Sequence, residues 1–162
     1  MQMKEFDRDF VERTKWIVQN VKCQYEVTLL LNCMLGLVNL PTERSKNKTA
    51  SNDSNDFRDA CVQKLNELGV IKKRTDDEKT FRAVRNAVSH LHIDPSDQCQ
   101  SNRCNSIKKI ILSDIENGKS SPHTILEFSI EQLKDFALFV ADKHLERLNS
   151  SQKKIPEEKS CG

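Results

Sequence analysis

The spacing of apolar residues predicts two helices in the N-terminal part of the chain. The first, over residues 7–21, has an inward face made of Phe6, Phe10, Thr14, Ile17, Val18 and Val21. The second, over residues 26–38, is apolar almost all the way round, as expected of a helix at the centre of a bundle. Pro41 marks its expected end, because proline lacks the N–H that continues a helix.

A polar stretch separates this pair from a third helix. Residues 42–55 are rich in Ser, Thr, Asn, Lys and Asp, a composition that cannot bury itself and predicts an exposed loop. The third helix is expected to begin near Asp56 and to stop at Gly69, a residue type that favours helix ends. Its inward face is made of Phe57, Cys61, Leu65 and Leu68.

A fourth helix follows directly. Asp76 or Asp77 supplies its expected cap, and Asp94-Pro95 breaks the helical pattern beyond its expected end at about Leu91. Its core-facing stripe is made of Phe81, Val84, Val88 and Leu91.

The pattern changes before the last helix. Residues 107–112 and 124–128 are typical of two short strands joined by a loop, with a helix around Ile107 as the alternative. Ser129 and Gln132 have the spacing of a capping box. The helix that they start has an inward face of Ile130, Leu133, Phe136, Ala137, Val140, Leu145 and Leu148. The expected fold is therefore mainly α, a bundle of about five helices with a small β-hairpin before the last helix.

Composition favours a single domain. A chain of 162 residues, 36% hydrophobic and 31% charged, can bury one core, so residues 1–148 are expected to form one domain and residues 149–162 a flexible tail. The first residues have no apolar signal core, and the longest apolar run, residues 27–40, is interrupted by polar residues and short for a bilayer span. We expect a cytoplasmic protein without membrane contact.

Basic residues offer only local contacts for nucleic acid. The formal charge of +2 is nearly balanced, so binding must come from patches rather than from a strong overall field. Lys72-Lys73-Arg74 and Lys108-Lys109 are the candidate RNA-binding runs. The alternative is that both runs are ordinary solvated surface.

The candidate chemistry lies in the stretch Arg85-Asn86-Ala87-Val88-Ser89-His90. Histidine exchanges protons near neutral pH, and arginine offers a fork of donors to a phosphate whose charge grows in the transition state. These are the groups that phosphodiester cleavage needs. Arg85 and His90 lie about 140° apart around a regular helix, so the arginine must swing round or act with a partner subunit's groups.

A second face of the same helix predicts a contact with another copy. Ala83, Asn86, Ala87 and His90 recur at helical spacing and turn away from the core-facing stripe. Small side chains there let another helix come close, so we expect a two-fold homodimer built on these four residues. Two Arg85 and two His90 side chains would then surround one cleft.

These residues and their surroundings resemble a known family. Arg85, Asn86 and His90, set beside Phe81-Arg82-Ala83-Val84, match the R-N-x-x-x-H signature of HEPN domains. The resemblance is to a plasmid- and island-borne HEPN subfamily and extends to about residue 148. Its N-terminal part rests on Phe10-Val11-Glu12-Arg13-Thr14, the run from Tyr25 to Cys33, and Leu37-Val38-Asn39-Leu40-Pro41.

The resemblance implies a helical domain that dimerises and acts as a metal-independent endoribonuclease leaving a 2′,3′-cyclic phosphate and a 5′-hydroxyl. His90 would exchange protons at the 2′- or 5′-oxygen, Arg85 would stabilise the phosphorane charge, and Asn86 would orient the phosphate or the imidazole. No cofactor is implied. Such nucleases serve as toxins or phage-defence effectors, so an antitoxin or partner protein is a candidate partner besides RNA. The alternative is a catalytically inactive HEPN dimer that binds RNA, a nucleotide or a protein.

Each motif residue also has a structural interpretation. His90 could be a helix-surface or interface histidine making one hydrogen bond. Arg85 could be a member of an ion pair, and Asn86 could satisfy backbone groups across the interface. The remaining histidines are expected to be structural or exposed, with His92 a candidate helper because it lies two residues from His90. They are His92, His123 and His144.

The six cysteines do not predict disulfides, because no signal segment indicates an oxidising compartment. Three of them fall in helical stretches and are expected in or near the core, namely Cys23, Cys33 and Cys61. Cys99 and Cys104, with His90 and His92, carry donor types that zinc accepts. The usual two-residue spacing of zinc-binding cysteines is absent, so no metal is expected.

Overall fold

The structure, a computed structural model, describes residues 3–22, 26–44, 51–74, 77–98, 107–115 and 121–152. These residues form five helices and four strands. In chain order the elements are α1 (Met3–Asn20), α2 (Glu26–Arg44), α3 (Ser51–Glu67), β1 (Ile71–Lys73), α4 (Asp77–Ser89), β2 (Ile93–Gln98), β3 (Ile107–Asp114), β4 (Thr124–Ser129) and α5 (Ile130–Gln152). The predicted mainly α fold is confirmed, and β3 and β4 are the predicted hairpin.

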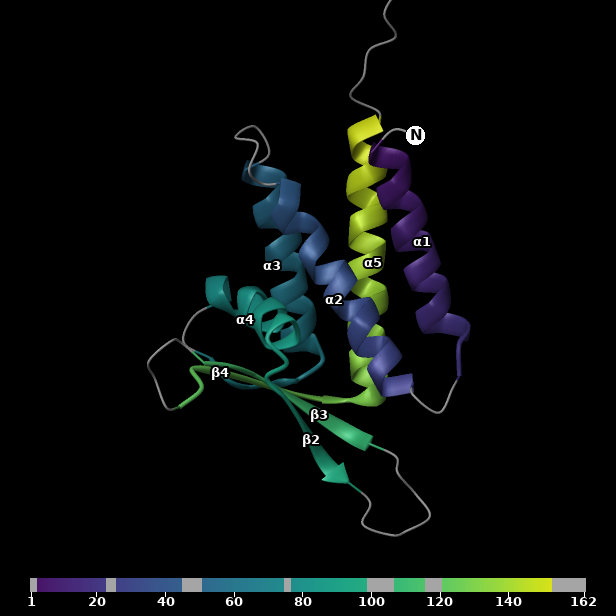
Figure 1. Ribbon diagram of the computed structural model, residues 1–162. Coiled ribbons are helices and arrows are strands. Elements are labelled where there is room, and N and C mark those ends of the chain that lie inside the picture. The colour runs from purple at the N-terminus through teal and green to yellow at the C-terminus, as the bar shows by residue number, and fades with distance from the viewer. Residues whose placement is uncertain are drawn as a thin grey trace, which may run out of the picture.

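The helices stand on one face of a small sheet (Figure 1). The sheet is antiparallel with strand order β1-β4-β3-β2. The short α4 packs against β3 and also against α2 and α3, while α5 packs against α1, α2 and α3. The helix that carries the motif is therefore held between the sheet and the other helices.

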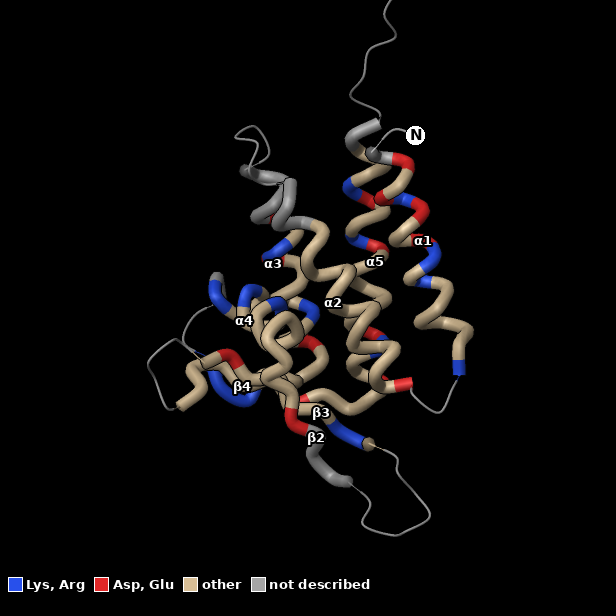
Figure 2. Tube along the Cα trace, in the orientation of Figure 1, with Lys and Arg blue, Asp and Glu red and all other residues tan. Residues whose placement is uncertain are grey.

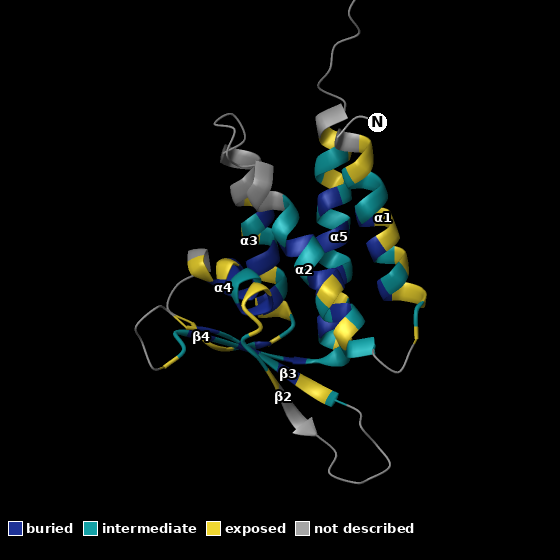
Figure 3. Ribbon diagram, viewed as in Figure 1, coloured by how far each residue is buried: buried dark blue, intermediate teal, exposed yellow. Residues whose placement is uncertain are grey.

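Buried residues gather where the helices face one another and the inner side of the sheet (Figure 3). Alternate strand residues are buried there, as expected of a sheet with one covered face, and they are Ile110, Leu112, Leu126 and Phe128. The prediction is wrong for Phe6, which is 58% exposed near the free end of α1. None of the described helices has both the length and the apolar character that crossing a bilayer requires.

The sequence pattern does not predict β1 or β2. β1 has only three residues, and β2 contains Pro95, which was expected to break regular structure. β2 lies at the edge of the sheet and, among the described strands, pairs with β3 alone. A proline is tolerated on an edge strand, because one side of such a strand has no neighbouring strand. A missing N–H on that side costs no hydrogen bond of the sheet.

The expected loop over residues 42–55 is wrong at both ends. α2 continues past Pro41 to Arg44, and α3 begins at Ser51. Residues 45–50 lie outside the described residues. A proline at position 41 removes the helical hydrogen bond to the carbonyl of Leu37, four residues earlier. His144 of α5 supplies a donor instead, because its Nε2 lies 2.8 Å from that oxygen.

Replacing His144 by phenylalanine is expected to lower the free energy of unfolding by about 1–3 kcal/mol, the usual cost of leaving a buried carbonyl without a donor. The His144 ring is buried and its centroid lies 4.7 Å from that of the Phe57 ring, so phenylalanine keeps an aromatic ring at this position and lacks the Nε2 donor. Urea denaturation followed by circular dichroism measures the loss. His144→Gln retains a donor and should lose less; an equal loss in both variants would assign the effect to packing.

Cys33 and Cys61 are buried free thiols, which confirms their expected place in the core. Burial raises the pKa of Cys33, and burial raises the pKa of Cys61 to about 12. Since only a thiolate is a good nucleophile, both thiols are unreactive at neutral pH. Cys23 lies outside the described residues.

Candidate functional site

The site is built on α4, which has one buried and one basic face. Phe81, Val84 and Val88 are at most 6% exposed, which confirms most of the predicted core-facing stripe. Lys79 and Arg82 are exposed and Arg85 is half-buried. Figure 2 shows these basic residues gathered along α4.

A tight turn follows α4 and contains His90, the last residue of the motif. The N–H of His90 donates to the Asn86 carbonyl, and the N–H of His92 reaches back to the Ala87 carbonyl, both at 2.9 Å, in the pattern of a Schellman cap. Leu91 lies between them, with a φ of 56°, and it is 78% exposed. The prediction that Leu91 faces the core is therefore wrong. A leucine in this left-handed conformation costs about 1–2 kcal/mol. The turn places His90 after the helix rather than within it.

A cleft of about 600 Å³ lies beside this turn. It is lined by Lys79, Arg82, Arg85, Asn86, His90, His92, Asp114, Ile115 and His123. The three motif side chains therefore share one cleft, although Arg85 and His90 would lie on different faces of a regular helix. Three basic side chains and three histidines give the cleft donors suited to an anion.

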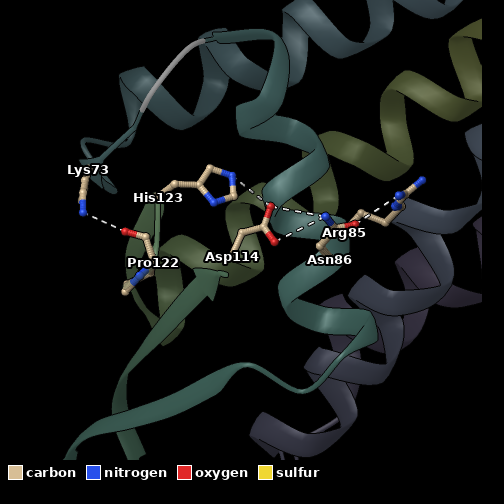
Figure 4. Close-up of polar contacts among 6 residues, drawn as sticks. All are labelled: Lys73, Arg85, Asn86, Asp114, Pro122 and His123. Atoms are coloured by element: carbon tan, nitrogen blue, oxygen red, sulfur yellow. Dashed lines mark hydrogen bonds and ion pairs between the residues drawn. The ribbon is translucent and has the colours of Figure 1, made fainter. Parts of the chain in front are cut away.

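Four side chains form a continuous row of polar contacts across the cleft (Figure 4). Arg85 Nη2 donates to Asn86 Oδ1 at 3.1 Å, and Asn86 Nδ2 donates to the two carboxylate oxygens of Asp114 at 3.4 and 3.3 Å. His123 Nε2 lies 3.4 Å from Asp114 Oδ2. The row joins two residues of α4 to two residues of the β3–β4 hairpin.

The sheet holds the hairpin end of this row in place. Asp114 is the last residue of β3 and pairs with Thr124, the first of β4. The backbone N–H of His123 donates to the Asp114 carbonyl at 3.1 Å. Lys73 of β1 donates from Nζ to the Pro122 carbonyl at 2.7 Å, and so ties down the residue before His123 (Figure 4).

The sequence motif does not point to four other polar residues that line the cleft, namely Lys79, Arg82, Asp114 and His123. His123 was expected to be merely structural or exposed, but its side chain is 13% exposed, lines the cleft and contacts Asp114. The predicted hairpin contained the missing signal. An aspartate at the end of one strand and a histidine just before the next are brought opposite each other by antiparallel pairing. His92 lines the cleft beside His90, with 5.9 Å between ring centroids.

The five candidate RNA-binding residues do not line the cleft. Lys72, Lys73 and Arg74 lie on or just after β1, with Arg74 Nη1 donating to Asn66 Oδ1 at 3.1 Å. Lys108 is exposed on β3, and Lys109 pairs with Glu127 at 3.1 Å. These residues remain candidates for contacts with RNA outside the cleft.

The expected dimer face needs correction. Ala83 and Ala87 are each 1% exposed within a single chain, because α4 packs against β3 as well as against α2 and α3. These two alanines therefore have no surface left for a second copy. Asn86 is half-buried and His90 is exposed, so only these two members of the face are open to a partner.

Within the described residues, no three His, Cys, Asp or Glu side chains are arranged to hold a metal ion. Cys99 and Cys104, the two thiols considered for zinc, lie outside those residues. Two ring nitrogens of described cleft residues, Nδ1 of His92 and Nδ1 of His123, are enclosed without a hydrogen-bond partner.

Comparison with known proteins identifies a family. A family model described as HEPN pEK499 p136 matches residues 1–151, which is nearly the whole chain. No curated protein and no solved structure matches the chain.

Proposed function

Because the chain belongs to the HEPN pEK499 p136 family, we propose that its cleft is a metal-independent endoribonuclease site in which the 2′-hydroxyl of the RNA is the nucleophile. The 2′-oxygen attacks the adjacent phosphorus and the 5′-oxygen leaves. The products are a 2′,3′-cyclic phosphate and a 5′-hydroxyl. One group must remove the 2′-proton and another must protonate the leaving oxygen.

The motif residues divide this work according to their chemistry. His90, exposed at the end of α4, exchanges a proton at the 2′- or the 5′-oxygen. Arg85 donates to the phosphoryl oxygens, where negative charge grows in the transition state. Asn86 orients the phosphate or the imidazole. The contact with Asn86 uses one N–H of the Arg85 guanidinium, which has five.

The observation that carries the proposal is that Arg85, Asn86 and His90 line one cleft together with Lys79 and Arg82. An anionic backbone entering the cleft would meet positive charge along α4 before it reached the motif. A structural ion pair, the alternative for Arg85, receives no support from the described contacts, because its partner there is the neutral amide of Asn86.

A homodimer would place a second His90 near the first and so supply both proton-transfer groups. Two exposed apolar side chains beside the site suit such a contact, since Leu91 follows His90 directly and Ile115 lines the cleft. The proposed interface is therefore the turn after α4 with Asn86 and His90, and excludes the buried alanines. A nuclease of this kind would act as a toxin or phage-defence effector restrained by an antitoxin or partner protein.

The test is to incubate the purified protein with end-labelled single-stranded RNA in excess chelator and to analyse the product ends. We expect cleavage that leaves 2′,3′-cyclic phosphate and 5′-hydroxyl ends. Cleavage that chelator abolishes would contradict a metal-independent site. RNA binding without cleavage across varied RNAs would favour the inactive, binding HEPN dimer.

A further inference from the structure

We propose that Asp114, which lies outside the Arg85–His90 motif, is the positioning residue of the cleft. It fixes the amide of Asn86 and, through that amide, aims the guanidinium of Arg85 at the phosphate. The inference rests on the proposed function for its kinetic readout, and a second readout is independent of cleavage.

The direction of each contact made by Asn86 follows from the charge of the groups on its two sides, Asp114 and Arg85. A carboxylate only accepts hydrogen bonds and a guanidinium only donates them. With Asp114 on one side, Asn86 must turn its NH₂ group toward the carboxylate, at 3.3 and 3.4 Å, and its carbonyl oxygen toward Arg85, at 3.1 Å. The reverse amide orientation would set acceptor against acceptor and donor against donor.

Asp114 is itself held firmly enough to direct its neighbours. Its side chain is only 10% exposed. A carboxylate buried to this extent needs hydrogen-bonding partners. Asn86 and His123 contact the carboxylate, and the Asp114 carbonyl accepts from the backbone N–H of His123. The end of β3, paired with β4, thus supports two side chains on α4, Asn86 directly and Arg85 through it. Such support is what keeps a reacting group within the narrow range of productive geometries.

Without Asp114, the Asn86 amide could rotate and present its NH₂ group to the guanidinium. Arg85 would then lose its acceptor and regain the rotamer freedom of a long side chain. In the parent protein Asn86 lies between Asp114 and Arg85, so the Asp114 carboxylate directs Arg85 without contacting it.

The kinetic test is a double-mutant cycle between Asp114→Asn and Arg85→Ala in RNA cleavage. Asp114→Asn keeps the shape of the side chain and is expected to lower kcat by about 100-fold, the scale of a small misplacement at a reacting centre. In the Arg85→Ala background the same change should cost almost nothing, because its effect passes through Arg85. Asp9→Asn, at a half-exposed aspartate on α1, is the matched control and should leave the rate unchanged. If the rate of the double variant falls by the product of the two single-variant factors, Asp114 and Arg85 act independently and the proposal is overturned.

The second test needs no activity. In NMR spectra of the parent protein, the Arg85 side-chain N–H signals should show slow rotation of the guanidinium, and Asp114→Asn should speed that rotation. Asn86→Ala breaks the same link one contact later and should have the same effect, which keeps the test decisive if Asp114→Asn does not fold. An Arg85 signal unchanged in the folded variants contradicts the proposal. A parent protein that cleaves no RNA but shows the NMR effect contradicts only the proposed function.

Discussion

Replacing His90 by alanine is expected to slow RNA cleavage by about 100-fold or more, and Arg85→Ala by a similar factor. These are the usual losses for removing an acid–base group or a donor to a developing charge. Both act on the same transition state, so the double variant should be little slower than either single variant. Cleavage rates measured at saturating RNA check all three variants.

Neither substitution should unfold the protein. His90 is exposed in the turn after α4, and Arg85 is half-buried beside a core-facing stripe made of other residues. Arg13→Ala, on the exposed surface of α1, is the matched arginine control and should cleave at the parental rate. If His90→Ala cleaves RNA at the parental rate while it keeps its helicity, His90 has no part in proton transfer.

The helices were predictable because their signals are local. Apolar spacing located all five, and the capping box at the start of α5 is present, with the Ser129 N–H donating to Gln132 Oε1 at 2.8 Å and the Gln132 N–H to Ser129 Oγ at 3.1 Å. Gly69, expected to stop α3, has a φ of 65° just beyond that helix. The end of α2 was missed because the donor that replaces the Pro41 N–H comes from His144, far away in the sequence.

The site was only partly predictable. The motif lies within six consecutive residues at the end of α4, so Arg85, Asn86 and His90 could be singled out from their spacing alone. Asp114 and His123 come from a hairpin, and their relation to the motif depends on how α4 packs against β3. That packing is a tertiary contact with no trace in the local pattern. A search for polar residues near the ends of the predicted strands would have found the two side chains, but not the contact between Asp114 and Asn86.

The dimer face was misassigned for a related reason. A stripe of small residues at helical spacing indicates close packing without indicating what packs there. Ala83 and Ala87 are buried within the chain itself, because α4 is covered by β3 as well as by α2 and α3. The elements that cover α4 were all predicted, but the sequence pattern does not show that they pack against its small residues.

The most direct test of the central claim uses a pair of oligonucleotides that differ in one atom. Once a cleavage site has been mapped, the nucleotide on the 5′ side of the scissile phosphate is replaced by its 2′-deoxy counterpart, and both substrates are incubated in excess chelator. If the 2′-hydroxyl is the nucleophile, cleavage at that phosphate should vanish completely, because no other group in the proposed mechanism attacks phosphorus. Cleavage of the deoxy substrate at the same phosphate would contradict the mechanism and indicate hydrolysis by water.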